Sequence, residues 1–449
     1  MAKKAVLTPM QVAMEIDPNV VTPPARTRPQ MKIAVIIAEF NPFHNGHEYI
    51  IKQAREVTRC THLLIVQSGN FTQRAEPAII EKHLRAKFAV LCGADAVVEI
   101  PTAFATGNAE IFAKGAVQIA NAFPHSAFLV FGVEDDNLAL LNQIAVAQVK
   151  MAPEFDKYIK QHLKQGISYD DARCEVIKKI LPQIPPITIA KILKGSNNIL
   201  AIEYLKELYR LKSKMLPVAI LRTGALTNET ATRTATKQNY SSALAIRNAI
   251  SVSVKEEPLQ LGDYIPARLV VPTEKALLAR PQKQLFETAT LFNALTVADA
   301  KKTYNVSEEL YNLFEKHQPV TQNELETTIP TRRYSISRVK RVALHSTIGV
   351  TKDDINFLYK HNYVPYTNLL AIRTDADELF AELCSVGRTP VIVRGNKNKP
   401  IPNAYTKRLE AIDKKAAVLY QVSCKQKFSH KPVFVTPKEI EKPNGRSQN

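Results

Sequence analysis

The sequence predicts an α/β fold in which a parallel β-sheet is followed by a mostly helical C-terminal region. Two observations carry this prediction. Runs that are apolar almost throughout recur at 32–40, 62–69, 95–101 and 127–133, as expected of strands buried on both faces. Segments with helical spacing lie between these runs, and strands that alternate with helices favour right-handed crossovers and a parallel sheet.

The elements can be assigned in order along the chain. Helices are expected after the first three strands, at 47–57, 79–93 and 108–123. Residues 136–195 look helical, with a less diagnostic pattern. The sequence then predicts an amphipathic helix at 197–211, a fifth strand at 215–224, a mobile Thr-rich loop at 225–241 and a helix at 242–251.

Five parts are expected in the 449-residue chain. They are a flexible arm at 1–30, an α/β domain at 31–251, a linker at 252–275, a helical, basic domain at 276–430 and a polar tail at 431–449. The arm lacks the apolar core of a secretory signal. The linker is predicted because it carries prolines and few helical signals.

Composition narrows the class of function. The net charge of +18 suggests a polyanionic partner, most often nucleic acid, although a lysine-rich surface is the simpler alternative. No apolar run approaches the roughly 20 residues of a membrane helix. The 5 cysteines are widely spaced and form no CxxC pair, which favours a cytoplasmic protein without a cysteine-bound metal.

The stretch EFNPFHNGHEYI, from Glu39 to Ile50, follows the first strand and opens the first helix. In an open parallel sheet, ligands bind beyond the carboxyl ends of the strands. A helix start suits phosphate, and His44 and His47 could both donate hydrogen bonds to phosphate oxygens. A turn that happens to hold two histidines is the alternative. Zinc is less favoured, because helical zinc pairs usually stand four residues apart and no third ligand is evident.

The segment from His44 to His47 resembles the HxGH signature of the nucleotidylyltransferase superfamily. SSALAIR, from Ser241 to Arg247, fits the second signature of that superfamily. Further stretches follow in the order found in the bacterial tRNA(Met) cytidine acetate ligase family, namely SGNFTQRAEPAIIEKHLRAKFAV, GADAVVEIP, AEIFAKGAV, FGVEDD, SNNILAIEY and ILRTGA. The resemblance runs from about 31 to 250 and continues more weakly through 332–345 and 363–373.

This resemblance implies a Rossmann-like nucleotidyltransferase domain at 31–251 and an ATP-dependent ligase. The enzyme would form acetyl-adenylate, release diphosphate, and acetylate N4 of the wobble cytidine in elongator tRNA(Met). The first step needs no general base, because acetate is already ionised at pH 7. Mg²⁺ is expected with the ATP triphosphate, and no protein-bound metal is expected. In the second step the wobble base must be presented unstacked.

The resemblance also implies the residues of the ATP site, with His44 and His47 as the catalytic pair. The continuous part comprises Ile37, Ala38, Glu39, Phe40, Asn41, Pro42, Phe43, His44, Asn45, Gly46, His47, Glu48, Tyr49 and Ile50. The separate ATP contacts are Gly132, Asn197, Arg222, Thr223 and Arg247. Asn197 could instead cap its helix, and Arg222 could be an ordinary surface arginine.

RNA contacts are expected from the basic run TRRYSISRVKR and from the loop after the second strand. The candidates are Arg74, Arg333, Tyr334, Arg338 and Arg341, with the Tyr334 ring as a stacking platform. A solvated basic helix face is the alternative for each arginine.

Four positions depart from the family pattern. The family usually has Gly at Ala75, Ser at Val133, and hydroxyl residues at Leu244 and Ala245. A lost hydroxyl would remove one phosphate donor. Two other functions therefore stay open, a transferase that makes a small cofactor by adenylyl or cytidylyl transfer and a catalytically weakened RNA-binding relative.

Overall fold

The computed structural model describes residues 30–222, 241–252, 260–296, 300–385, 389–393 and 403–441. The chain divides into Met1–Met31 and Lys32–Asn449, and the elements named below all lie in the second of these units. The predicted arm at 1–30 and loop at 225–241 therefore lie almost wholly outside the described residues.

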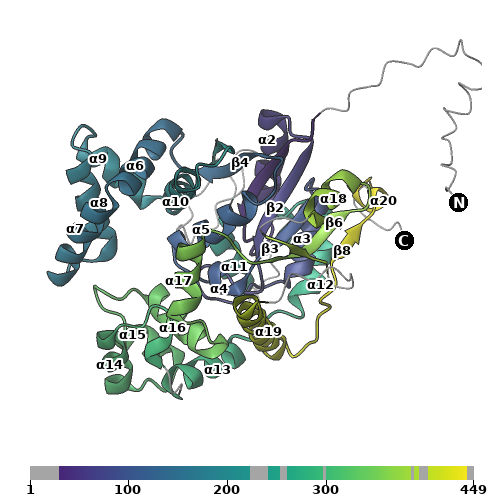
Figure 1. Cartoon of the computed structure of the whole chain (residues 1–449). Helices are drawn as coiled ribbons and strands as arrows, with labels where there is room; N and C mark the ends of the chain where they lie inside the picture. The colour runs from purple at the N-terminus through teal and green to yellow at the C-terminus, as the bar shows by residue number, and fades with distance from the viewer. Residues whose placement is uncertain are drawn as a thin grey trace, which may run out of the picture. The chain divides into compact units, whose positions relative to one another are not determined.

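A parallel sheet forms the centre of this unit, as the sequence predicts (Figure 1). Its five parallel strands run in the order β5-β4-β1-β2-β3. They are β1 (Ile33–Ala38), β2 (His62–Ser68), β3 (Ala96–Ile100), β4 (Ser126–Val133) and β5 (Leu216–Leu221). All five coincide with the predicted runs to within a few residues.

Helices cover both faces of the sheet. Residues Ala34 and Ile36 of β1 belong to one core cluster with apolar residues of α2 (Asn45–Thr58) and α3 (Lys82–Leu91). Side chains alternate along a strand, so their neighbours in β1 face the other side. There α5 (Ala109–Ala120) packs across β1, β2 and β3, and α10 (Ser196–Arg210) packs on α5 and β4.

The strand order places a topological switch between β1 and β4. Chain connections run from β1 outward through β2 to β3, and then return to β4 on the other side of β1. Ligands bind in the crevice that such a reversal opens beyond the carboxyl ends of the strands. The carboxyl end of β1 carries the histidine-containing stretch, so the fold puts that stretch at this crevice.

The C-terminal half completes the sheet, which the sequence analysis did not predict. β6 (Thr367–Arg373) pairs antiparallel with β3, while β7 (Val391–Ile392) and β8 (Val433–Val435) pair with β6. The run 367–373 was overlooked because the surrounding pattern is helical. The linker prediction also missed α12 (Val270–Leu277). The domain boundaries at 251, 276 and 430 stay predictions.

The remaining helices belong to two groups. Between β3 and α10 lie α4 (Thr102–Ala105), α6 (Leu138–Lys150), α7 (Ala152–Lys164), α8 (Tyr169–Ile180) and α9 (Pro186–Lys194). After β5 come α11 (Ala243–Val252), α13 (Lys283–Thr296), α14 (Glu308–His317), α15 (Gln322–Thr328), α16 (Ile336–Ile348), α17 (Lys352–His361), α18 (Asp377–Cys384), α19 (Ala404–Cys424) and α20 (Pro437–Glu441).

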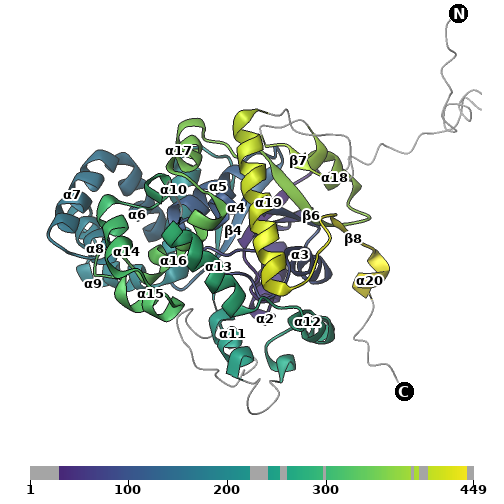
Figure 2. The same ribbon diagram turned by 90° about the horizontal axis from the view of Figure 1, so that it is seen from below.

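The long helix α19, yellow in Figure 2, packs against α4, α13 and α16. The Tyr420 hydroxyl on α19 donates to the Ala78 carbonyl at 2.9 Å, and Asp413 accepts from the Thr102 N–H at 2.8 Å. The C-terminal helices therefore hold the loops that follow β2 and β3. Within the described residues, no helix combines the length and apolar character needed to cross a membrane.

Candidate active site

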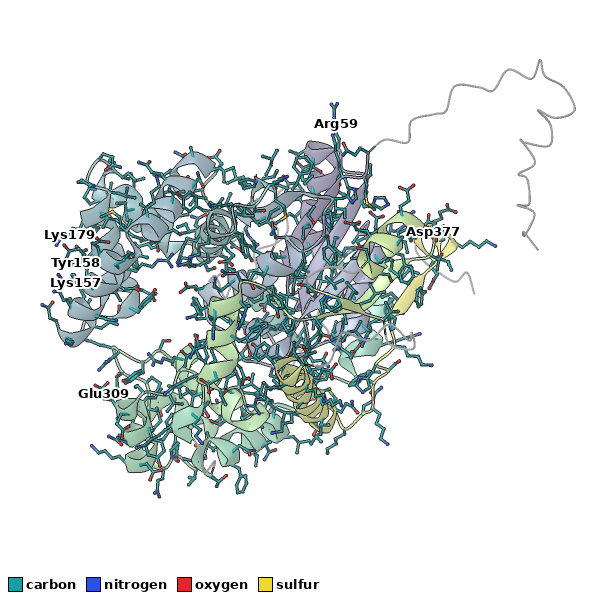
Figure 3. All side chains as sticks on the ribbon, in the orientation of Figure 1. Arg59, Lys157, Tyr158, Lys179, Glu309 and Asp377 are labelled. Carbon is teal, nitrogen blue, oxygen red and sulfur yellow. The ribbon has the colours of Figure 1, made fainter. Side chains whose placement is uncertain are left out.

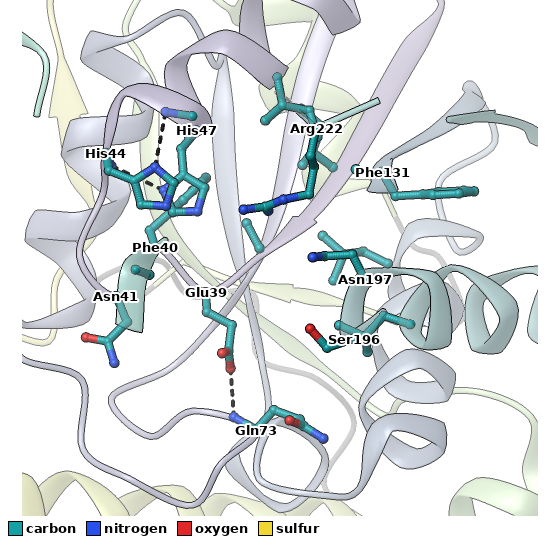
Figure 4. Close-up of a pocket in the computed structure, with 18 of the residues that line it drawn as sticks. Glu39, Phe40, Asn41, His44, His47, Gln73, Phe131, Ser196, Asn197 and Arg222 are labelled. Carbon is teal, nitrogen blue, oxygen red and sulfur yellow. Dashed lines mark hydrogen bonds between the residues drawn. The ribbon is translucent and has the colours of Figure 1, made fainter. Parts of the chain in front are cut away.

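A cavity of about 250 Å³ lies at the switch point between β1 and β4 (Figure 4). Its walls come from the ends of β1, β4 and β5, from the start of α2, α10 and α11, and from the loop after β2. The lining residues from the predicted ATP site are Ile37, Ala38, Glu39, Phe40, Asn41, His44, Gly46, His47, Tyr49, Ile50, Gly132, Asn197, Arg222 and Arg247. Most of the predicted site is thus brought together in one place.

The two histidines cap the helix that they begin. The Gly46 N–H donates to His44 Nδ1 at 3.1 Å, and the His44 N–H donates to His47 Nδ1 at 3.2 Å. This is a reciprocal capping box in which both side chains are imidazoles. The neighbouring Asn41 takes no part in the cap, and its side chain accepts from the Ile79 N–H at 2.9 Å.

The cap fixes the tautomer of both rings. Because each Nδ1 accepts a backbone N–H, the proton of each neutral imidazole is on Nε2. Burial and the nearby Arg222 and Arg247 guanidinium groups lower the pKa of His44 to about 3. Burial also holds the pKa of His47 well below its usual range, and His44 lowers it further. Both histidines are therefore neutral donors near pH 7, and their rings stack with centroids 3.6 Å apart.

Two arginines bring positive charge to the same cavity. Arg222 follows β5, where its N–H donates to the Val133 carbonyl at 2.9 Å, and its side chain lies along Gly132. A Cβ at position 132 would come within 3.2 Å of Arg222 Cγ, so the glycine leaves room for the arginine stem. Arg247 on α11 donates to the Asn41 carbonyl at 2.6 Å. Burial lowers the pKa of both guanidinium groups, which still stay charged near neutral pH.

Asn197 lines the cavity at the start of α10, but it is not the cap of that helix. The Glu134 carboxylate, which follows β4, accepts from the N–H groups of Asn197 and Asn198 at 3.1 and 2.9 Å. The Asn197 side-chain amide also donates to Glu134, at 2.5 Å. Next to it, Ser196 Oγ is buried and has no hydrogen-bond partner among the described residues. Figure 4 shows Ser196 and Asn197 facing the cavity from the side opposite the histidines.

Glu39 places a carboxylate inside the cavity. Its Oε1 accepts from the Gln73 N–H at 2.7 Å, which links the end of β1 to the loop after β2. Burial raises the pKa of this carboxyl group, and nearby arginines only partly oppose the shift. Glu39 was predicted only as one of the ATP contacts of the segment 37–50, and its raised carboxyl pKa is a feature that the sequence did not indicate.

Arg85 has a structural role. Its fully buried guanidinium donates to the backbone carbonyls of Glu39, Gly69 and Ile80. Glu39 directly follows β1 and Gly69 directly follows β2, so one side chain ties the carboxyl ends of these two strands together. With its guanidinium engaged in this way, Arg85 is not available to bind a ligand in the cavity.

Several predicted ATP contacts are not part of the cavity wall. Phe43 is buried beneath the His47 ring, with centroids 5.6 Å apart, and Pro42 is buried beside it. The Asn45 side chain donates to the Asp263 carbonyl at 3.3 Å, and Glu48 pairs with Lys52. Thr223 lies outside the described residues.

The cavity also has an apolar wall that the sequence analysis missed. It is formed by Phe112 of α5, Phe131 of β4, Ile220 of β5 and residues of α10. On α10 the lining residues Ser196, Leu200 and Tyr204 are each four apart, the spacing of one helix face. That periodicity was readable in the sequence, but nothing in it distinguished a cavity wall from an ordinary buried face.

Two of the predicted RNA-binding residues, Tyr334 and Arg341, are buried. Tyr334 is only 3% exposed, and its hydroxyl donates to Glu309 at 2.6 Å, so the ring is not available for a base stack. Glu309 itself lies on the outer side of α14 (Figure 3) and also pairs with Arg333. Arg338 donates to the Asn305 carbonyl at 2.9 Å.

Arg341 is also buried, which corrects its prediction as an RNA contact. It donates to the carbonyls of Thr106 and Gln73 at 2.9 and 3.2 Å. The neighbouring Lys340 pairs with Glu76 at 3.1 Å. Helix α16 therefore supports the loop 73–76 from behind. Arg74 in that loop lines the cavity.

The four departures from the family pattern do not touch the cavity. Leu244, Ala245, Val133 and Ala75 are all missing from the wall that the described residues form, and three of them are buried in the core. Ala75 has φ of +58°, in the left-handed region that favours glycine, which explains why glycine is usual there. The departures therefore give no structural reason to expect a weakened ATP site.

The chain is similar to known proteins over most of its length. Residues 31–432 match the family model HIGH Nucleotidyl Transferase. The tRNA(Met) cytidine acetate ligase of Caldicellulosiruptor bescii is 33% identical, over 90% of this chain and 99% of that protein. The ligase of the same name from Acetivibrio thermocellus is 32% identical, over 81% of this chain and 88% of that protein.

Solved structures of Thermotoga maritima TmcAL share the fold. The apo form has a TM-score of 0.80 and 28% identity, and covers 90% of this chain and 100% of that chain. A second form, bound with alpha-thio ATP, has a TM-score of 0.79 and 27% identity. The chain thus belongs to the tRNA(Met) cytidine acetate ligase family of HIGH nucleotidyl transferases.

Proposed function

We propose that this chain ligates acetate to a cytidine of tRNA(Met) with ATP as the energy source. Acetate would first attack the α-phosphorus of ATP, giving acetyl-adenylate and diphosphate. The acetyl group would then pass to N4 of the wobble cytidine of the elongator tRNA, releasing AMP. The observation that carries the proposal is the His44–His47 capping box, which aims two neutral donors into a cavity at the switch point of the sheet.

Repulsion between two anions is the main obstacle in the first step. The two Nε2–H groups would donate hydrogen bonds to the phosphate that is attacked, and the positive end of the α2 dipole would stabilise its negative charge. Neutral histidines suit this task, because they donate hydrogen bonds without needing to be protonated at pH 7. Arg222 and Arg247 supply the permanent charge that offsets the triphosphate.

Mg²⁺ is expected to arrive with the triphosphate. The described part of the chain holds no group of three or more His, Cys, Asp or Glu side chains placed to bind a metal ion. Phosphate oxygens and water would therefore supply most of its ligands, as is common for Mg²⁺. When bound, the ion would neutralise charge on the β- and γ-phosphates.

The tRNA would approach from the β2 side of the cavity. Arg74 lines the cavity there, and Arg333 and Arg338 lie on the C-terminal half. We retain these three as RNA contacts, and exclude the buried Tyr334 and Arg341. The net charge of +18 supports a polyanionic partner. Since the reaction uses ATP and tRNA, we expect the protein in the cytoplasm.

The test is incorporation of labelled acetate into tRNA. The protein is incubated with ATP, labelled acetate and elongator tRNA(Met), and a tRNA with uridine at the wobble position serves as the matched control. We expect label in the first tRNA only, dependent on ATP. Absence of label with folded protein would contradict the proposal. Diphosphate release that depends on a small phosphorylated acceptor would support the alternative of a cofactor-making transferase.

A further inference from the structure

The cavity contains one carboxylate whose function is not explained by ATP binding. Glu39 is the only Asp or Glu among the described residues that line the cavity. Its Oε1 is held by the Gln73 N–H, whereas its second oxygen has no hydrogen-bond partner among the described residues. Glu39 lines the cavity, and its second oxygen is accessible from there.

The fold puts Glu39 on the side of β1 that faces the loop after β2. Gly132 and Arg222 line the cavity from β4 and β5, on one side of β1, and the two histidines stand at its centre. Glu39 turns the other way, toward the loop that follows β2. In Figure 4 the Glu39 carboxylate points away from the two histidines, toward Gln73, from whose N–H it accepts a hydrogen bond. A second substrate that meets the adenylate from the β2 side would come to this carboxylate.

The second step needs a group that accepts a proton. When the N4 amine attacks the acetyl carbon, an N–C bond forms and the C–O bond to the phosphate breaks. AMP leaves with that electron pair, and the nitrogen must lose one proton to yield the amide. Neither histidine can take it, because each Nδ1 accepts a backbone N–H and burial holds the pKa of His44 at about 3.

Building on the proposed function, we infer that Glu39 is the general base of acetyl transfer, its second carboxylate oxygen accepting the proton from the attacking N4 amine. A carboxylate oxygen can act as a general base when it lies within hydrogen-bond reach of the nucleophile. The proton would then pass to solvent as the acetylated tRNA leaves.

The surroundings of Glu39 suit this role. Burial raises the pKa of the carboxyl group, which makes it a stronger base than an exposed glutamate, while Arg247, Arg85 and Arg74 keep it ionisable. Tyr204 is the other titratable group close to it, and burial keeps that phenol protonated. The Gln73 loop that orients Glu39 is in turn held by Arg341, which makes Arg341 a positioning residue.

The experiment separates the two steps. Adenylate formation is followed by acetate-dependent exchange of labelled diphosphate into ATP, and transfer is followed in a single turnover with synthetic acetyl-adenylate and tRNA(Met). For Glu39→Gln we expect transfer to fall by about 100-fold or more, the usual contribution of a general base. Adenylate formation should fall by less than tenfold. The matched control is Glu56→Gln, an exposed glutamate of α2, which should match the wild type in both assays.

The pH dependence distinguishes a base from a merely structural group. The wild-type transfer rate should rise with pH on the acid side and then level, as the Glu39 carboxyl group loses its proton. Glu39→Gln should lack this limb, and Glu39→Asp should keep it with a lower plateau. Equal losses in both steps, or an unchanged pH profile, would overturn the inference. Failure of the wild type to acetylate tRNA from acetyl-adenylate would instead overturn the proposed function, and the inference with it.

Discussion

Replacement of Arg85 by leucine tests how the catalytic strand ends are held together. Arg85 is fully buried, and it donates to the backbone carbonyls of Glu39, Gly69 and Ile80. Leucine fills part of the space but donates no hydrogen bond, so these carbonyls, and that of Ser68 at 3.4 Å, lose a donor. Each buried group left unpaired costs about 1–3 kcal/mol. Leucine also removes the cost of burying the guanidinium charge, which offsets part of that loss. We therefore expect a net destabilisation of about 3 kcal/mol or more.

The assay is urea unfolding followed by fluorescence and circular dichroism, with the midpoint compared at equal slope. Arg59→Leu is the matched control, because Arg59 is exposed at the end of α2 (Figure 3). Its free energy of unfolding should stay within about 0.5 kcal/mol of the wild type. A loss below about 1 kcal/mol in Arg85→Leu would refute the reasoning, since unpaired carbonyls of this kind cost more than that.

Three further predictions concern donors, pH and the C-terminal half. His47→Ala should lower adenylate formation by about 100-fold or more, the usual effect of losing one transition-state donor, and a loss below fivefold in the diphosphate exchange assay would contradict it. Burial lowers the pKa of both His345 and His44 from 6.5 to about 3. Between these two pH values the unfolded chain therefore binds more protons than the folded chain. Stability should therefore fall as pH drops from about 6.5 toward 3, and thermal melts of His345→Gln should show a weaker fall. Tyr334→Phe removes a hydroxyl that donates to Glu309, so it should cost about 1 kcal/mol of stability and leave tRNA affinity in filter binding unchanged, whereas a tenfold loss of affinity would restore Tyr334 as an RNA contact.

The parallel part of the fold was predictable because burial on both faces leaves a plain signature. Runs such as 32–40 are apolar throughout, and helical spacing between them specifies the crossovers. The antiparallel β6 gives no comparable signal, because it is a short run within a helical region and pairs with a strand more than 260 residues earlier. Local pattern cannot report such a long-range pairing.

The difference between local pattern and long-range contact also explains which features of the site were predictable. The position of the two histidines follows from local sequence, since a strand end and a helix start fix it. Their tautomers follow from the hydrogen bonds of the reciprocal cap, which the sequence alone does not reveal. The buried roles of Arg85, Tyr334 and Arg341 could not be predicted, because an arginine or tyrosine on a basic segment looks the same in sequence whether it faces solvent or core. Glu39 was part of the motif, and its carboxylate became chemically significant only once the Gln73 loop was placed beside it.

The most direct test of the central claim is a crystal structure of the protein with a non-hydrolysable analogue of acetyl-adenylate. We predict that oxygens of the phosphate lie within about 2.7–3.2 Å of Nε2 of both His44 and His47. The acetyl group should lie on the side of Glu39 and the loop after β2. An analogue bound outside this cavity, or bound there with its phosphate away from both histidines, would contradict the account.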